Sequence, residues 1–287
     1  MTRGAVPSGE PARTDGFAAI ESYGVIGDSE SVALVAGDGA IDWWAAPAID
    51  SPPVFAAVLD PRDGGCFTLE PTVPYQVKRR YLPGTNVLET TFGTRDGTVR
   101  VLDSLNQGAN GPLPWTELAR DIRPEHGEVP MRWRVAAGTL FHRVRPWARI
   151  RDVPILHAGN LMVVLVTEGT GQPETGLGEF SGEFVAKAGK NALLTLIAAD
   201  RAPLVVPSAA DVRGRREASE EAWAATGTCS NACGWRWTGP ARTWTRPART
   251  CSMRWGTTCA TSGPNPTAGY GSSTSGGTTR SPRSAAG

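Results

Sequence analysis

The sequence predicts a mainly β fold, an antiparallel β-sandwich with a short C-terminal linker helix, followed by a non-globular tail. Three observations support this prediction. Short apolar segments separated by Gly- and Pro-containing turns run from about residue 18 to 206, as in sandwiches of many short strands. A charged segment with a helix start follows at 207–223. After Trp223 the composition changes abruptly, and the apolar residues needed for a core disappear.

The N-terminal segment, residues 1–17, is rich in Pro, Gly, Arg and Ser and contains no apolar run. We therefore expect it to be disordered. Neither a signal-peptide core nor a run of 18 apolar residues occurs in the chain. The sequence thus predicts a cytoplasmic protein with no membrane partner.

The segment 18–206 carries the signals of strands and turns, and we expect it to form the sandwich domain. Three pairs of strand-like segments flank turn residues and predict hairpins: 31–35 with 40–44, 87–94 with 98–102, and 179–186 with 192–198. Met131–Ala136 alternates in polarity, and Leu161–Val166 is an apolar run of strand length. Val54–Leu59 follows Ser51-Pro52-Pro53, which predicts a short helical turn capped by Ser51.

The segment 207–223 predicts a solvated linker helix. Ser208 and Asp211 resemble a capping box in which Asp replaces the usual Glu. Six of the following twelve residues are Arg or Glu, which are typical of a helix exposed to water.

The tail, residues 224–287, differs in composition from everything before it. Residues 1–223 hold 22 basic and 28 acidic residues, a balance of −6, whereas the tail holds 7 Arg and no other charged residue. Together they give the net charge of +1. The tail contains no Ile, Leu, Val, Phe, His or Gln, but it contains four of the five cysteines and four of the ten tryptophans.

Disorder, a zinc site and disulfides are three interpretations of the tail, but a shifted reading frame explains its composition better. When codons are read one base earlier, the junctions before Trp244, Cys251, Trp255 and Cys259 encode Leu, Met or Val, and the junction before Ser252 can encode Phe or Leu. The recovered apolar positions have relative spacings of 0, 7, 8, 11 and 15, which is one face of a helix. We therefore predict that 224–287 is a frameshift product without an evolved function.

The known sequence motifs of catalysis and cofactor binding are absent from the sequence. It has no phosphate loop, dinucleotide fingerprint, metalloprotease helix or nucleophile elbow, and its three histidines share no ligand spacing. We therefore expect no cofactor, no metal and no catalytic residue in this chain. The negative charge of residues 1–223 also disfavours a nucleic acid partner.

Residues 20–60 combine carboxylates, adjacent indoles and rigid turns. Carboxylates accept hydrogen bonds from sugar hydroxyls, and indole rings stack on the apolar faces of sugars. Asp42, Trp43 and Trp44 are therefore candidates for sugar contact or for a domain interface. The alternative is structural: the Asp residues beside Gly or Ser fix turns, and one of two neighbouring indoles on a strand belongs to the core.

The same residues resemble the N-terminal domain of bacterial family-15 glycoside hydrolases, the glucoamylase and trehalase-like group. The first block of the resemblance consists of Ile20-Glu21-Ser22-Tyr23, Ile26-Gly27-Asp28, Asp38-Gly39-Ala40-Ile41-Asp42-Trp43 and Asp50-Ser51-Pro52-Pro53-Val54-Phe55. It continues in 79–90, 97–101 and 129–132. The family pattern has Asp where this chain has Ser22, Ser where it has Ala40, and Phe where it has Ile49.

This resemblance implies an antiparallel β super-sandwich joined by a helical linker to an (α/α)6 barrel. In the family, two barrel Glu residues hydrolyse α-glucosidic bonds of trehalose or maltooligosaccharides with inversion. No residue here matches those two Glu, so we expect a truncated, noncatalytic domain whose partner is the missing barrel. Two alternatives stay open: a free-standing carbohydrate-binding module that takes α-glucosides, and an inactive structural fragment.

Overall fold

The computed structural model describes residues 13–108, 113–200, 206–232, 236–237 and 244–245, with side chains up to Ala224. Most of the expected N-terminal segment 1–17 and of the expected tail 224–287 lies outside these residues. Residues 13–17 are described, and Thr14 and Phe17 exchange backbone hydrogen bonds of 2.9 Å. Within the tail, the structure describes only the backbone of a helix end and of two short strands, β16 (Arg236–Trp237) and β17 (Trp244–Thr245).

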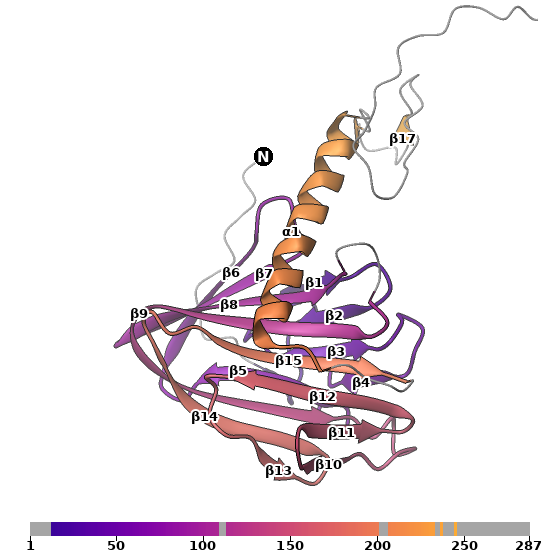
Figure 1. Ribbon diagram of the computed structural model, residues 1–287, viewed down its shortest axis with the longest axis vertical. Coiled ribbons are helices and arrows are strands. Elements are labelled where there is room, and N and C mark those ends of the chain that lie inside the picture. Colours follow the sequence, from indigo (N-terminus) through magenta and orange to yellow (C-terminus); the bar gives the residue numbers. More distant parts are fainter. Residues whose placement is uncertain (1–12, 109–112, 201–205, 233–235, 238–243, 246–287) are drawn as a thin grey trace, which may run out of the picture. The chain divides into compact units, whose positions relative to one another are not determined.

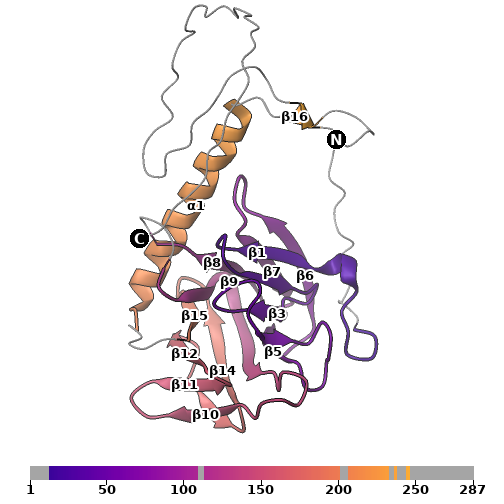
Figure 2. The ribbon, with the colours of Figure 1, turned by 90° about the vertical axis from the view of Figure 1, so that its right-hand side faces the viewer.

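The described residues form two antiparallel layers, which can be followed in Figure 1 and from a perpendicular direction in Figure 2. The first layer contains β1 (Gly24–Gly27), β2 (Val32–Val35), β3 (Ile41–Ala45), β4 (Pro53–Ala56), β5 (Gly65–Pro71), β13 (Glu174–Gly176) and β14 (Glu179–Lys187). A short 3-10 helix, η1 (Ile20–Ser22), precedes it. The second layer contains β6 (Tyr75–Tyr81), β7 (Leu88–Thr94), β8 (Gly97–Asn106), β10 (Trp147–Ile150), β11 (Pro154–Ala158), β12 (Leu161–Glu168) and β15 (Ala192–Ala199). The predicted antiparallel sandwich is therefore confirmed.

One strand, β9 (Thr116–Ala137), belongs to both layers. Its first half pairs with β8 and β15, and its second half pairs with β5 and β14. Gly127, with φ +66°, lies between the two halves, and a Cβ atom there would be 1.9 Å from the Asp96 carbonyl oxygen. Only glycine fits this close approach, so Gly127 permits the strand to pass from one layer to the other.

The core between the layers consists of inward-facing apolar side chains from both of them. Its largest fully buried members are Trp44, Trp133 and four phenylalanines, Phe55, Phe67, Phe92 and Phe180. The alternating residues of β9 explain part of this pattern, because Met131, Trp133 and Val135 are buried while the residues between them are more exposed. The core thus runs along the shared strand.

Two of the three predicted hairpins are confirmed, and the third is wrong. β2 pairs with β3, and β7 pairs with β8. β14 and β15 are both strands, but they pair with opposite halves of β9 and not with each other. Because the two halves lie in different layers, the turn at Gly189-Lys190 carries the chain from one layer to the other.

The helical turn predicted at Val54–Leu59 is wrong in its first half; only residues 57–59 form a turn, in which the Leu59 and Asp60 N–H groups donate to the Ala56 carbonyl. Residues 53–56 form β4, which pairs with β3 and places Val54 and Phe55 in the core. Ser51 accepts a hydrogen bond from the Ala48 backbone N–H at 3.1 Å instead of capping a helix. Burial of three successive side chains, Val54 to Ala56, outweighs the local helix signal.

The predicted helix is α1 (Ala209–Ala232), which extends beyond Trp223. Its start has the expected reciprocal contacts: the Asp211 N–H donates to Ser208 Oγ, and the Ser208 N–H donates to Asp211 Oδ2. It is less solvated than predicted, because Val212, Arg216 and Ser219 are buried. α1 contacts β8, β9 and β12. Within the described residues, no helix has the length and apolar character that a membrane crossing requires.

Candidate functional site

The turn between β2 and β3 presents two carboxylates four residues apart. Asp38 lies in the turn, where its Oδ1 accepts the Ala40 N–H at 3.0 Å, and the following Gly39 has φ +85°. Asp42 lies on β3 with its side chain turned inward and 1% exposed. The turn-fixing interpretation of Asp38 is therefore confirmed, but the same residue has a second role.

Arg13 bridges these two carboxylates. Its Nε lies 2.6 Å from Asp38 Oδ2, and its Nη1 lies 2.9 Å from Asp42 Oδ2. The Tyr23 hydroxyl donates to the same Asp42 oxygen at 2.7 Å. The Asp42 carboxylate thus has partners from the N-terminal segment and from the residue before β1. We call Arg13, Tyr23, Asp38 and Asp42 the Arg13 cluster.

The electrostatics of the Arg13 cluster follow from its burial and its opposite charges. Burial raises the pKa of Asp42, although the hydrogen bonds from Arg13 and Tyr23 act in the opposite direction. Burial alone would lower the pKa of Arg13, but hydrogen bonds to Asp38 and Asp42 raise it overall. Burial and the neighbouring Asp42 raise the pKa of Tyr23, which therefore stays protonated as a donor. The cluster holds one permanent cation between two carboxylates.

The structure separates the three residues predicted as the site. Asp42 belongs to the Arg13 cluster, whereas Trp44 is completely buried, with its ring centroid 5.8 Å from that of Phe55 in the core. Trp43 alternates with Trp44 and is half-buried on the other face of β3. Of the two predicted indoles, only that of Trp43 therefore has surface open to a ligand.

Sequence reasoning missed Arg13 and Tyr23. Arg13 lies in the segment expected to be loose, 25 residues before its partner Asp38, and no local pattern marks it. A physical argument could have indicated a cation here. Two carboxylates lie close together at the end of one hairpin, and burying an unpaired charge is costly. Tyr23 stood within the block that carries the family resemblance, but its partner was not evident.

A polar pocket of about 430 Å³ opens beside the Arg13 cluster. Its walls come from Arg13, from the β2–β3 turn, from the end of β5 with the following loop, and from β9. It is lined by Arg13, Asp38, Glu70, Pro71, Thr72, Val73, Pro74, Tyr75 and Arg132. We call this the cluster pocket.

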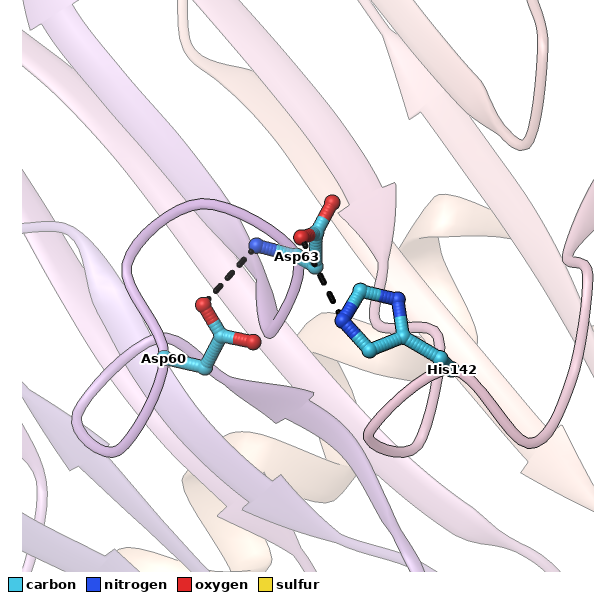
Figure 3. A group of neighbouring side chains, drawn as sticks. All are labelled: Asp60, Asp63 and His142. Atoms are coloured by element: carbon cyan, nitrogen blue, oxygen red, sulfur yellow. Dashed lines mark hydrogen bonds and ion pairs between the residues drawn. The ribbon is translucent and has the colours of Figure 1, made fainter.

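A second polar group lies at another place in the fold, where Asp60, Asp63 and His142 approach one another (Figure 3). Their ligand atoms all lie within 4.8 Å of one another, and His142 Nε2 is 3.9 Å from Asp63 Oδ2. The Asp60 carboxylate accepts the backbone N–H groups of Arg62 and Asp63 at 3.1 Å, so it serves as a turn cap. This role accounts for Asp60, and the side chains of Asp63 and His142 are exposed.

The buried carboxylates of the described residues are all paired with arginine. Each is at most 3% exposed, and the five are Asp42, Glu89, Asp103, Glu117 and Asp121. Their partners are Arg13 for Asp42, Arg80 and Arg100 for Glu89, Arg120 for Asp103, Arg215 for Glu117, and Arg123 and Arg213 for Asp121. A catalytic acid or base has to reach the substrate within hydrogen-bond distance. These five carboxylates are sealed from solvent and already occupied.

The part of the chain that contains the Arg13 cluster and the cluster pocket is similar in sequence to known proteins. Residues 13–139 match the family described as trehalase-like, N-terminal. The trehalase of Mycolicibacterium smegmatis is 39% identical over 124 residues, and that of Mycobacterium tuberculosis is 38% identical over 130. The trehalase of Thermoplasma volcanium is 34% identical over 112 residues.

These alignments cover 43%, 45% and 38% of this chain but only 18% of each relative. Among solved structures, one described as a kojibiose phosphorylase from the human microbiome aligns with 69% of this chain and 33% of its own, at 8% identity and a TM-score of 0.33. The family match begins at Arg13 and includes the whole Arg13 cluster and every residue that lines the cluster pocket. Residues 13–139 are therefore similar in sequence to trehalase-like N-terminal domains.

Proposed function

We propose that this chain is the noncatalytic N-terminal β-sandwich of a family-15 glycoside hydrolase. The parent enzyme hydrolyses α-glucosidic bonds in trehalose or maltooligosaccharides with inversion, and its two catalytic Glu residues lie in a barrel that follows the sandwich. The function of the sandwich is to support that barrel. The match to about one fifth of the length of several trehalases supports this proposal.

The observation that carries the noncatalytic role is the pairing of every buried carboxylate in the described residues with arginine. Inverting hydrolysis needs two carboxyl groups about 6.5–9.5 Å apart that face the substrate, one of them with a raised pKa. Asp42 has a raised pKa, but it is buried and in contact with Arg13 and Tyr23. A substrate could not reach it without displacing both partners.

The first test is an activity measurement. The purified chain is incubated with trehalose and with maltotriose, and released glucose is compared with a blank and with the M. smegmatis trehalase as a positive control. We expect no glucose above the blank. Turnover by the purified chain would refute the noncatalytic role.

The second test examines the supporting role. In the M. smegmatis trehalase, the segment that aligns with this chain is replaced by the corresponding residues of this chain. We expect the chimera to be soluble and to hydrolyse trehalose. A chimera that also carries Arg13→Ala should lose solubility or activity, because the buried Asp42 is left without a cation. A well-folded chimera without trehalase activity would contradict the proposal.

A further inference from the structure

The cluster pocket joins two arginine–carboxylate pairs across one opening. On one side, Arg13 pairs with Asp38 at 2.6 Å. On the other side, Arg132 on β9 pairs with Glu70 on β5, with Nη2 2.7 Å and Nε 2.9 Å from Glu70 Oε1. The Tyr75 hydroxyl donates to the other Glu70 oxygen at 3.3 Å. The lining of the pocket therefore contains donors and acceptors that these two ion pairs hold in place.

The lining of the cluster pocket has no net charge, because two guanidinium groups balance two carboxylates. A pocket for a phosphate or a carboxylate presents arginines whose donors are free for the anion. Here the guanidinium groups of Arg13 and Arg132 already form two-point contacts with Asp38 and Glu70. The arrangement favours a neutral ligand whose groups both donate and accept hydrogen bonds, which is the property of a polyhydroxylated molecule.

The walls of the cluster pocket are rigid. Pro71 and Pro74 flank Thr72 and Val73, and the Thr72 N–H donates to the Pro130 carbonyl of the neighbouring strand at 2.9 Å. Rigid walls reduce the ordering entropy that binding costs.

The aromatic wall of the pocket is Tyr75. Its ring packs edge-on against Phe92 of the core, with centroids 5.5 Å apart and an angle of 77°. An aromatic ring beside paired polar groups suits a sugar, which has apolar C–H faces as well as hydroxyls. The volume of about 430 Å³ lies in the range of small-molecule sites, roughly 300–1,000 Å³.

We propose that the cluster pocket binds a neutral mono- or disaccharide through hydroxyl contacts to Glu70, Tyr75, Arg132 and the Arg13–Asp38 pair. The choice of an α-glucoside as the ligand rests on the proposed function. The proposed sugar site thus lies on the β5–β9 side of the Arg13 cluster. Asp42 supports the site by holding Arg13. The indoles of Trp43 and Trp44 do not line the pocket.

The test uses the full chain and two isosteric variants on the same face of the sheet. Glu70→Gln removes the carboxylate that holds both Arg132 and Tyr75. The matched control is Glu179→Gln, because Glu179 pairs with Arg134 two residues further along β9 and is not part of the pocket. Both carboxylates are exposed to a similar degree, 29% for Glu70 and 31% for Glu179.

Binding of trehalose and of glucose is measured by calorimetry and by chemical-shift changes of the Thr72 and Val73 amides. For the unaltered chain we expect saturable binding with a Kd on the order of 1 mM. Glu70→Gln should weaken binding about tenfold, because hydrogen bonds to a charged group are lost. Glu179→Gln should stay within about twofold of the unaltered chain, since Glu179 does not line the pocket.

Four outcomes would overturn the pocket proposal. In the unaltered chain, they are no saturable shift of the Thr72 or Val73 amide with either sugar, and tighter binding of inorganic phosphate than of sugar. In the variants, they are equal weakening of sugar binding by Glu70→Gln and Glu179→Gln, and a well-folded Glu70→Gln variant that binds sugar normally. Circular dichroism of each variant separates lost binding from lost folding. If Glu70→Gln does not fold, Tyr75→Phe replaces it and should weaken sugar binding severalfold. Hydrolysis of trehalose by the chain would contradict the proposed function but not the pocket, so the two failures are distinguishable.

Discussion

The Nε atom of Arg215 on α1 lies 3.0 Å from Oε1 of Glu117 on β9, and the Glu117 side chain is completely buried. Asn106 on β8 donates to the same carboxylate oxygen at 2.8 Å and also to the Val212 carbonyl of the helix at 3.2 Å. The helix is thus fixed to the sandwich through a buried carboxylate, with a small apolar contact around Val212. Its first turns are a structural part of the sandwich and not a free linker.

Loss of the Arg215 guanidinium should therefore destabilise the whole domain. In Arg215→Ala, Glu117 remains buried with Asn106 as its main partner, and we expect the free energy of unfolding to fall by about 3 kcal/mol. Urea unfolding measures this loss. The control is Arg134→Ala, whose exposed pair with Glu179 should contribute less than about 1 kcal/mol. Equal effects of the two substitutions would show that α1 is only loosely attached.

Arg13→Ala should be comparably destabilising, although Arg13 stands at the start of the described chain. The substitution leaves the buried Asp42 with only the Tyr23 hydroxyl as a partner, and we expect a loss of about 3 kcal/mol in thermal unfolding. Arg62→Ala is the control, because Arg62 is exposed and its backbone N–H, which the substitution keeps, donates to Asp60. A melting temperature unchanged by Arg13→Ala would mean that Asp42 does not need the guanidinium.

Acid should weaken the fold through Glu89. Burial alone would raise its pKa, but hydrogen bonds from Arg80 and Arg100 lower it below the ordinary value of 4.5. The ionised carboxylate therefore contributes stability that is fully present above about pH 4.5 and is lost as the pH falls through the lowered pKa. The difference in unfolding free energy between the unaltered chain and Glu89→Gln should shrink between pH 6 and pH 3.

The control for the pH experiment is Glu128→Gln, because Glu128 forms an exposed pair with Lys187. Its difference from the unaltered chain should be small at every pH, since exposed pairs contribute little. A Glu89→Gln difference that stays constant from pH 6 to pH 3 would contradict the lowered pKa of Glu89.

Two glycines with the same backbone conformation should respond very differently to alanine. Gly127→Ala would place a Cβ atom 1.9 Å from the Asp96 carbonyl, so we expect the variant not to fold. Gly189→Ala has a similar φ of +78° but no atom within 4 Å of the new Cβ, and should cost only about 1–2 kcal/mol of backbone strain. Circular dichroism and urea unfolding of the two variants test whether the approach of β9 to Asp96 is as close as described.

The frameshift prediction is tested by resequencing the source DNA beyond the codon for Trp223. We expect a corrected frame that encodes an amphipathic helix in place of residues 244–259 and continues into a catalytic barrel. A clean read of the present frame, together with related chains that share this tail, would contradict the prediction. The helix α1 continues to Ala232, beyond Trp223, so the end of the helix does not coincide with the predicted change of reading frame.

The sequence predicted the positions of strands and of the helix well, but it predicted less well which strands pair with each other. The hairpins β2–β3 and β7–β8 were predictable because their turn residues and apolar segments are adjacent in the chain. The separation of β14 from β15 was not, because it depends on β9, whose paired residues lie 43 to 82 positions earlier in the chain. Pairing across such distances is decided by packing and leaves no mark in the local pattern.

The candidate site shows the same division. Asp38 could be assigned to a turn from its neighbours alone, and one of two adjacent indoles could be assigned to the core from strand alternation. The cation between Asp38 and Asp42 could not be identified, because Arg13 is brought to them by tertiary structure. The polar pocket likewise combines residues from four separate parts of the chain.

The sharing of β9 between the two layers also determines how the domain can assemble. Neither layer can be completed before this strand is in place, and the residues that pair with it extend from Gly65 to Ala198. Most of the chain must therefore be synthesised before either layer closes, which predicts slow folding with strong cooperativity. Evolution could lengthen or replace the loops around such a sandwich, but it could not split it into two halves that persist independently.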